Sequence, residues 1–175
     1  SRMIVLSSIG RVALARVLLG STADRVAESA SIPTLVVRRG MVFSAWAEGR
    51  RPLRILVAAD FSTASDAALE FARDWARSGP VDLVVGHVAD PARERERRRM
   101  DPHDEQGGSL RTALERDLQE RAGLFLDGVS FTLAVELSAE EPSAVLIELA
   151  KENQADLIVT GTHQTHGVRR LWHHS

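Results

Sequence analysis

Short apolar runs alternate with segments of helical periodicity along most of this chain, and this alternation constrains the fold strongly. Apolar strands are expected at residues 3–8, 32–37, 54–59, 81–88, 129–137 and 155–160. Apolar strands joined by helices form a parallel sheet with helices on both faces. We therefore expect an α/β fold of the doubly wound, Rossmann-like kind, with ligands held at the carboxyl ends of strands where the chain order reverses.

Segments with helical spacing of apolar residues separate these strands. Helices are expected at about 22–30, from Ser62 to a Gly-Pro stop at 79–80, at 110–126 and at 142–153. Two stretches show no such period. Residues 40–52 carry Gly and Pro at their borders, and we interpret them as a linker. The polar stretch 91–108 contains a run of arginine and glutamate and is interpreted as solvated or mobile chain, with an anion-binding lid as the alternative.

The two ends of the chain look like two copies of one unit, in which an apolar strand enters a loop and then a helix. The first copy runs from its strand to Gly10 and, nine residues later, to Gly20 and Ser21. The second copy runs from Gly161 to Ser175 in the same register, without a gap. Backbone N–H groups and the helix dipole face an anion at such a helix start. The repeat therefore predicts phosphate-binding loops.

Composition narrows the classes of function. A hydrophobic fraction of 44% is ample for a buried core, and a net charge of −2 argues against binding to nucleic acid or to a membrane surface. Partners are expected to be small molecules or proteins. The chain has no cysteine, which excludes disulfides, thiolate metal sites and thiol nucleophiles. Without a long apolar run or a signal-peptide pattern, the protein is expected to be cytoplasmic.

Three stretches resemble the universal stress protein family. They are residues 55–62, matching the family's first strand and loop, residues 86–88 in its second strand, and residues 155–163 in its fourth. The spacing from Gly10 to Gly20 resembles part of the family's nucleotide signature, which reads Gly, two residues, Gly, nine residues, Gly and then Ser or Thr. This resemblance covers nearly the whole chain. It implies a five-stranded parallel sheet of the nucleotide-binding α-hydrolase-like type, with strand order 3-2-1-4-5.

The resemblance also implies a domain organisation. Residues 1–39 match the closing portion of one family domain, residues 40–52 form a linker, and residues 53–175 match a second domain without its last helix and strand. The parent would then be a tandem protein with two such domains. A permuted single domain is the alternative, in which the strand at 32–37 supplies the missing edge in cis or in a swapped dimer.

The ligand that the resemblance implies is an adenine nucleotide, ATP, bound either alone or together with Mg²⁺. In the nucleotide-binding branch of the family, the positions matching Ala58 and Val88 line the base pocket, and the position matching Asp60 lies near the ribose and adenine. The phosphate-side positions carried over are Gly10, Gly20, Ser21, Gly161, His163 and Ser175. Asp60 also has a chemical argument, because a carboxylate at the end of a strand accepts hydrogen bonds from ribose hydroxyls. Its alternative role is to cap the following helix.

Both copies of the phosphate loop depart from the family signature. Ser7 replaces the leading glycine of the first copy, and Gln164 and His174 replace two glycines of the second. Where a glycine has φ > 0, a side chain costs about 1–2 kcal/mol. Because about 1.4 kcal/mol is tenfold in affinity, we expect the second loop to bind phosphate more weakly by one to two orders of magnitude or more.

Catalytic and metal sites are not expected. Four histidines gather in the second loop, His163, His166, His173 and His174. No carboxylate lies at ligand spacing from them, so contact with phosphate is favoured over a metal site. The chain has no nucleophile with an adjacent base and no Gly-Lys-Ser/Thr loop of a P-loop hydrolase. His87 is interpreted as a packing residue, and Trp46, Trp75 and Trp172 as packing or linker contacts.

The function that the resemblance implies is regulatory: an ATP-binding protein that acts in stress response by binding and signalling and not as an enzyme. A ligand-free dimerisation module with a degenerate nucleotide site and a slow ATPase are the alternatives. The strand at 32–37 is short, apolar and expected at a sheet edge, and such edges pair with partners. It predicts a homodimer or a tandem pseudo-dimer.

Overall fold

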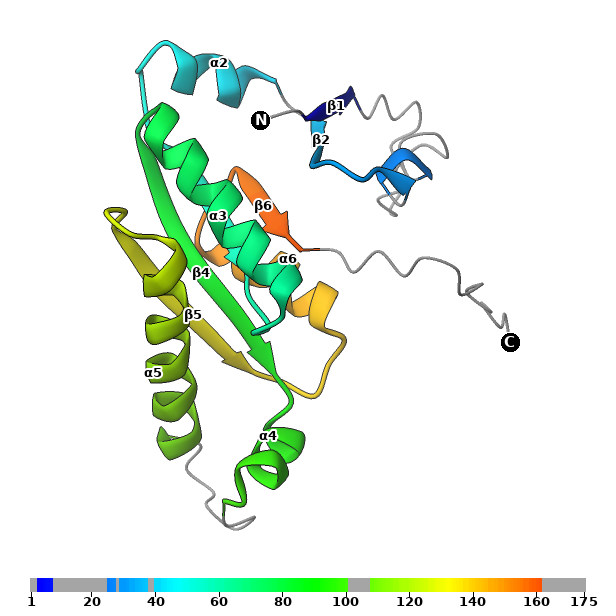
Figure 1. The fold of residues 1–175 in the computed structure, drawn as a ribbon, viewed down its shortest axis with the longest axis vertical. Coiled ribbons are helices and arrows are strands. Elements are labelled where there is room, and N and C mark those ends of the chain that lie inside the picture. The colour runs from blue at the N-terminus through cyan, green and yellow to red at the C-terminus, as the bar shows by residue number, and fades with distance from the viewer. Residues whose placement is uncertain (1–2, 8–24, 28, 38–39, 101–107, 162–175) are drawn as a thin grey trace. The chain divides into compact units, whose positions relative to one another are not determined.

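The structure is a computed structural model that describes residues 3–7, 25–27, 29–37, 40–100 and 108–161. The chain divides into two compact units, of which the larger spans Val42–Thr162 and the smaller includes Ser1–Met41. Each unit has its own parallel sheet (Figure 1).

The larger unit contains a four-stranded parallel sheet with the order β5-β4-β3-β6. Its strands are β3 (Leu53–Ala58), β4 (Val81–Ala89), β5 (Phe131–Leu137) and β6 (Leu157–Thr160). In chain order within the unit this is 3-2-1-4, which matches the first four places of the expected order. No fifth strand joins this sheet within the described residues.

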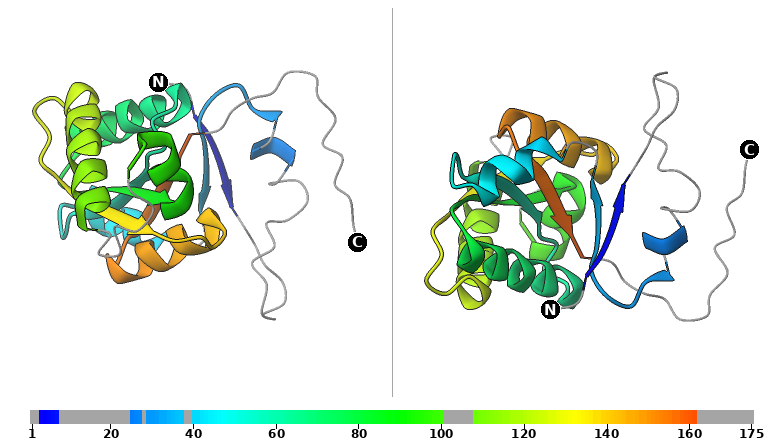
Figure 2. Two further views of the ribbon diagram at one scale, coloured as in Figure 1. Left: turned by 90° about the horizontal axis from the view of Figure 1, so that it is seen from below. Right: turned by 90° about the horizontal axis from the view of Figure 1, so that it is seen from above.

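Helical crossovers connect these strands. α3 (Thr63–Ser78) connects β3 to β4, α4 (Pro91–Arg98) and α5 (Gly108–Phe125) lie between β4 and β5, and α6 (Pro142–Glu152) leads to β6. The first two connections step away from β3 in one direction, whereas the third returns past β3 to its other side. Because parallel crossovers are right-handed, α6 covers the face opposite to α3 and α5, as Figure 2 shows. None of the described helices is long and apolar enough to span a bilayer.

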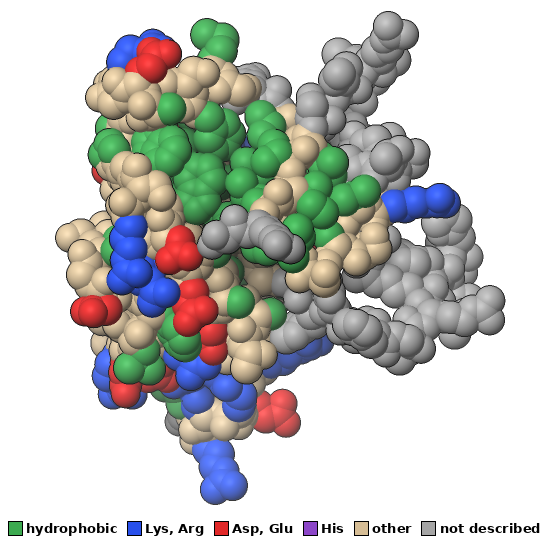
Figure 3. Space-filling view, turned by 45° about the horizontal axis from the view of Figure 1, so that its top comes forward, with side chains coloured by type: hydrophobic (Ala, Val, Ile, Leu, Met, Phe, Trp, Pro, Cys, Tyr) green, Lys and Arg blue, Asp and Glu red, His purple; other side chains and the backbone are tan. Residues whose placement is uncertain are grey.

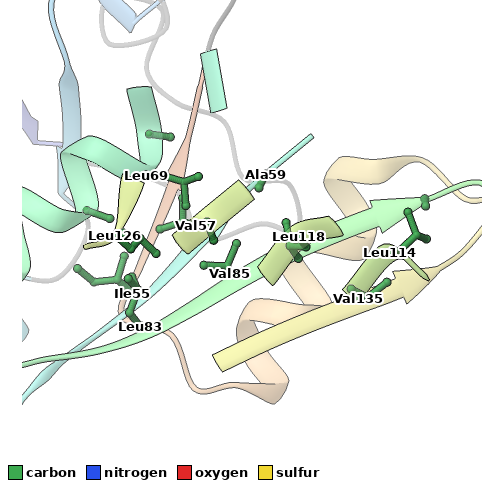
Figure 4. Close-up of a cluster of buried hydrophobic side chains, with 14 of the residues drawn as sticks. Ile55, Val57, Ala59, Leu69, Leu83, Val85, Leu114, Leu118, Leu126 and Val135 are labelled. Atoms are coloured by element: carbon green, nitrogen blue, oxygen red, sulfur yellow. The ribbon is translucent and has the colours of Figure 1, made fainter. Parts of the chain in front are cut away.

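The larger hydrophobic core lies between the sheet and helices α3 and α5 (Figure 4). Successive residues of β3 face opposite sides of the sheet: Ile55 and Val57 belong to this core, while Leu56 packs with Leu149 and Ala150 of α6. All three β3 residues are fully buried. A strand that is buried on both faces has a continuous apolar sequence, and this is why the segment was predictable from sequence.

The stretch 40–52, expected to be a linker, contains the helix α2 (Met41–Ala47). Its Phe43 and Trp46 pack against Trp75 of α3, with ring centroids 5.9 and 5.2 Å from that of Trp75. The indole N–H of Trp46 donates a hydrogen bond to the Pro80 carbonyl oxygen at 2.9 Å. The stretch has more regular structure than expected because tertiary packing stabilises a helix that is too short to be stable alone. The interpretation of Trp46 and Trp75 as packing residues is confirmed.

The polar stretch 91–108, expected to be solvated or mobile chain, begins with the helix α4. Asp90 caps this helix and Pro91 occupies its first turn, a combination that favours helix initiation. Arg98 joins α4 to α5 through Asp117, with 2.8 Å between nitrogen and oxygen. No α4 residue is fully buried. In Figure 3, basic and acidic side chains lie beside one another over the lower part of the view. The expectation of a solvated face holds for α4, but the expectation of irregular chain was wrong there.

The smaller unit pairs β1 (Ile4–Ser7) with β2 (Thr34–Val37) in parallel. Ile4 lies opposite Thr34, and Ser7 opposite Val37. Between the two strands in the chain, residues 25–27 and 29 are helical. This agrees with the expected strand–helix–strand order, since parallel neighbours need a crossover connection.

Candidate functional site

The candidate site lies at the carboxyl ends of β3, β4 and β6. Ala58 is the last residue of β3 and lies opposite both Gly86 of β4 and Thr160 of β6. The chain leaves β3 toward α3 on one face of the sheet, whereas it reaches β6 from α6 on the other. The order of the chain therefore reverses between β3 and β6, and doubly wound sheets bind their ligands at such a point.

The structure brings four of the predicted site residues to this edge. Ala58 and Val88 are half-buried at the ends of β3 and β4, while Asp60 and Gly161 are exposed just beyond β3 and β6. The other predicted site residues lie outside the described part of the chain: Gly10, Gly20, Ser21, His163 and Ser175. The same is true of the substituted loop positions and of the remaining histidines of the second loop: Gln164, His166, His173 and His174.

The turn after β3 has a left-handed backbone residue. Phe61 has φ 63°, a conformation that is uncommon for a residue with a side chain. Asp60 precedes it, and its Oδ1 accepts a hydrogen bond from the Ser62 N–H at 3.0 Å. Ser62, not Asp60, caps α3, because its side chain accepts the Ser65 N–H at 3.2 Å. The alternative role of Asp60 as the helix cap was therefore wrong. Its exposed carboxylate is oriented by its own turn.

Gly161 packs directly against the first turn of α3. A Cβ added to Gly161 would lie 2.1 Å from the Ala64 carbonyl oxygen and 2.7 Å from the Ser65 nitrogen. Both are backbone atoms of a helix, which cannot move aside as the end of a flexible side chain can. Only glycine fits here, so the chain leaving β6 crosses the start of α3, within two residues of the cap Ser62.

His87 of β4 supports the turn after β3 from inside the protein. It is only 6% exposed, and its Nδ1 lies 2.7 Å from the Ala59 carbonyl oxygen. Since a carbonyl only accepts hydrogen bonds, Nδ1 carries a proton, and in the neutral ring Nε2 has none. The His87 ring also meets the Phe61 ring edge-on, with centroids 4.9 Å apart. Nε2 is buried and has no hydrogen-bond partner among the described residues.

Burial lowers the pKa of His87, because a buried site disfavours the charged imidazolium. The Ala59 carbonyl and the carboxylates of Glu94 and Asp60 act in the opposite direction, and the Arg97 guanidinium adds to the lowering. Burial prevails, so the ring is neutral near pH 7. The interpretation of His87 as a packing residue was therefore incomplete, since it also binds the backbone that leads into the Asp60 turn.

The described part of the site offers binding chemistry. The Asp60 carboxylate can accept hydrogen bonds from hydroxyl groups. Helix starts of the α3 kind can present backbone N–H groups to an anion, and at α3 Ser62 accepts those of Ser65 and Asp66. Within the described ranges, no three His, Asp or Glu side chains lie close enough together to hold a metal ion. A polar ligand with hydroxyl groups and an anionic end fits these features.

Comparisons with known proteins agree with this architecture. A sequence model of the universal stress protein family matches residues 2–38 and 53–175. A search of curated proteins finds no match. A solved universal stress protein from Archaeoglobus fulgidus DSM 4304 has a TM-score of 0.60 at 22% identity, and the likeness covers 89% of this chain and 49% of that one. The present chain thus spans about half the length of that protein, and the two share the α/β fold.

Two further solved structures contain a nucleotide. A universal stress protein in complex with cAMP has a TM-score of 0.44 at 23% identity, covering 62% of this chain and 72% of that one. The universal stress protein from Archaeoglobus fulgidus in complex with dAMP has a TM-score of 0.44 at 20% identity, covering 61% and 78%.

Proposed function

The chain belongs to the universal stress protein family, and on that basis we propose that its larger unit binds ATP at the carboxyl ends of β3 and β6. One observation carries this proposal. Asp60 and Gly161, the residues assigned from sequence to the ribose and phosphate sides, follow neighbouring strands at the point where chain order reverses. Ligands of doubly wound sheets bind at this point.

Each described residue of the site has a role in this proposal. The exposed carboxylate of Asp60 accepts hydrogen bonds from the ribose hydroxyls. Ala58 and Val88, half-buried at neighbouring strand ends, provide apolar surface for the adenine ring. The phosphates lie toward Gly161, where the chain passes close to the start of α3. Mg²⁺ would be bound through the phosphate oxygens, because the described residues supply no cluster of metal ligands.

The proposed role in stress response is binding and signalling, without turnover. Asp60 is assigned a binding role in this proposal, and its carboxylate is oriented by the Ser62 N–H of its own turn. A slow ATPase remains the catalytic alternative, and it requires that phosphate release from ATP depend on Asp60.

A second candidate function, an interaction module, is favoured by strand β6. β6 pairs with β3 along one edge and with no other strand of the described residues, and Ile158 on β6 is 38% exposed. Strand edges of this kind pair with partners. In this alternative the functional unit is a homodimer or a tandem pseudo-dimer, and nucleotide is not needed.

Calorimetric titration of the chain with ATP tests the proposal. Asp60→Ala removes a charged hydrogen-bond acceptor, which is worth about 1.5–3 kcal/mol, so affinity should fall roughly ten- to a hundredfold. Asp82→Ala is the matched control: it removes an exposed carboxylate near the amino end of β4 and should leave ATP affinity unchanged.

Two outcomes would count against ATP binding at this site. Equal titrations of the wild type and Asp60→Ala would show that Asp60 is not part of the pocket. An absence of ATP binding by the wild type, together with more than one chain per particle in light scattering, would move the assignment to the interaction module. Phosphate release that Asp60→Ala abolishes would instead support the slow ATPase.

A further inference from the structure

We propose that His87 is a positioning residue of the nucleotide site: its Nδ1–H holds the Ala59 carbonyl and its ring supports Phe61, so that Asp60 is presented to the ligand only while the imidazole is neutral. The ligand in this inference rests on the function proposed above. The effect of His87 on the turn can be measured in the protein without ligand.

Both the N–H and the carbonyl group of Ala59 form hydrogen bonds to β4. Its N–H donates to the Gly86 carbonyl oxygen at 2.8 Å, which continues the ladder between β3 and β4. Its carbonyl oxygen lies 2.7 Å from His87 Nδ1, so a side chain of the next β4 residue fixes the following peptide plane. Asp60 comes directly after this point. The direction in which the chain leaves β3 therefore depends on His87.

The left-handed conformation of Phe61 needs support from its surroundings. A residue with a side chain at φ 63° is disfavoured by its own sterics and persists only where neighbouring contacts hold it. The edge-on contact between the Phe61 and His87 rings, with 4.9 Å between centroids, is such a contact. The Asp60 Oδ1 to Ser62 N–H bond spans the same turn, so a change at Phe61 alters the position of the carboxylate.

Protonation of His87 would leave the Nδ1–H donor in place but add a second N–H inside the protein. The new Nε2–H would be buried, and no described residue accepts a hydrogen bond from it. The charged groups that face the ring are Asp60 from the turn and Glu94 and Arg97 from α4. Burial is the largest influence and lowers the pKa; the Ala59 carbonyl and the two carboxylates favour the imidazolium, and Arg97 opposes it.

A charged ring is therefore driven toward water and away from Ala59 and Phe61. The sign of the resulting pH effect follows from the lowered pKa. Above the ordinary histidine value of about 6.5, the ring is neutral and Asp60 is presented. As pH falls through the lowered pKa, ligand affinity should decrease.

Adenosine is the ligand for the test, because it has no phosphate. Phosphate groups titrate near pH 6, and the expected contact between phosphate and the histidines of the loop after Gly161 would add a second pH dependence. The wild type should bind adenosine at pH 7.5 and lose roughly tenfold in affinity as pH falls and the ring becomes protonated. His87→Asn keeps an N–H donor near the place of Nδ1, so it should bind within a few-fold of the wild type and show no such pH dependence.

His87→Leu keeps an apolar side chain but removes the donor. Because the hydrogen bond to the Ala59 carbonyl is lost, adenosine affinity should fall roughly five- to tenfold at every pH. Leu83→Ala controls for lost stability, because Leu83 is a buried core residue nearer the amino end of the same strand. It should lower stability without changing adenosine affinity or its pH profile.

A measurement without ligand separates failure of this inference from failure of nucleotide binding. Nitrogen-15 NMR of the imidazole should show the Nδ1-protonated tautomer, and protection of the Ser62 amide from exchange should be lost as the ring becomes charged. An Nε2-protonated ring, or a Ser62 amide indifferent to the protonation of His87, would overturn the positioning role. If adenosine does not bind to the wild type at pH 7.5 while the NMR results are as expected, nucleotide binding fails and the control of the turn by His87 stands.

Discussion

The two ends of the four-stranded sheet are built differently. At the amino end, the Arg51 guanidinium makes two hydrogen bonds of 2.8 Å to Asp156, and Asp156 also accepts the Arg54 N–H at 3.0 Å. At the carboxyl end, Phe61 has a left-handed backbone and His87 Nε2 is buried without a partner among the described residues. A left-handed residue occurs at both ends, because Gln154 before β6 has φ 51°. What distinguishes the carboxyl end, where function is proposed, is the buried imidazole nitrogen beside its left-handed turn. Satisfied ion pairs hold the other end.

This contrast predicts that the two ends respond differently to substitution. Changes at the amino end should lower stability and leave ligand affinity intact. Changes at the carboxyl end should act on ligand binding.

The largest effect is expected for Gly161→Ala. Its Cβ would collide with backbone atoms of α3, so β6 or the start of α3 must shift. Overpacking of this severity should lower the free energy of unfolding by about 3 kcal/mol, and ATP affinity should fall more than tenfold because the site is displaced. Chemical denaturation and calorimetry measure the two quantities.

Gly123→Ala is the control for this substitution. Gly123 lies within α5, where an added Cβ meets no atom within 4 Å. Alanine should therefore stabilise the protein by about 0.5–1 kcal/mol through its helix propensity. Equal effects of the two substitutions on stability and on ATP affinity would contradict the close packing of Gly161.

The next largest effect is expected for Asp156→Ala. The change leaves the Arg51 guanidinium and the Arg54 N–H without their carboxylate, so the free energy of unfolding should fall by about 2 kcal/mol. ATP affinity should be unchanged under conditions where the variant is folded. Asp82→Ala removes only an exposed partner of Arg54 at 3.7 Å and should cost less than about 0.5 kcal/mol. A loss of ATP affinity in Asp156→Ala without a loss of stability would break the distinction between the ends.

The smallest effect concerns pH, and acid should weaken the carboxyl end first. The folded-state pKa of His87 is lowered by burial, so the unfolded state binds more protons below the ordinary value of about 6.5, and stability declines from there as pH falls. For Asp156, burial raises the pKa, but the hydrogen bonds and charge from Arg51 and Arg54 outweigh burial and lower it. Its contribution is present above about pH 4 and is lost only as pH falls further.

Denaturant titrations between pH 7.5 and 3 can separate the two groups. In a plot of the free energy of unfolding against pH, each titrating group should contribute a slope of at most about 1.4 kcal/mol per pH unit. His87→Asn should remove the decline that begins near pH 6.5, and Asp156→Asn should remove the one below pH 4. If His87→Asn leaves the upper part of the curve as it is in the wild type, the buried neutral ring is not the titrating group.

The fold of the larger unit was largely predictable from sequence because its strands are apolar runs and its main helices have clear periods. The helix α2 was not, since its seven residues are too few for a period to be distinguished, and its partner Trp75 is brought to it only by folding. The start of α4 did carry a signal in Asp90 and Pro91, but the charge run that follows concealed it.

The candidate site was predictable in part for the same reason. The alternation of strands and helices was enough to predict that Asp60 and Gly161 follow neighbouring strand ends. The hydrogen bond from His87 to Ala59 was not predictable, because it depends on the register between β3 and β4, which no local pattern encodes. The close approach of Gly161 to α3 depends on tertiary packing in the same way.

The neighbouring positions of β3 and β6 also limit how this unit can form during synthesis. Ile55 lies opposite Leu157, and the Arg54 N–H that meets Asp156 is 102 residues earlier in the chain. β3, β4 and β5 can associate as they leave the ribosome, but β3 has an unpaired edge until β6 has emerged. Because long-range parallel pairing is slow and leaves nascent edges open to aggregation, the interval between translation of β5 and β6 is when this unit is most exposed to misassembly.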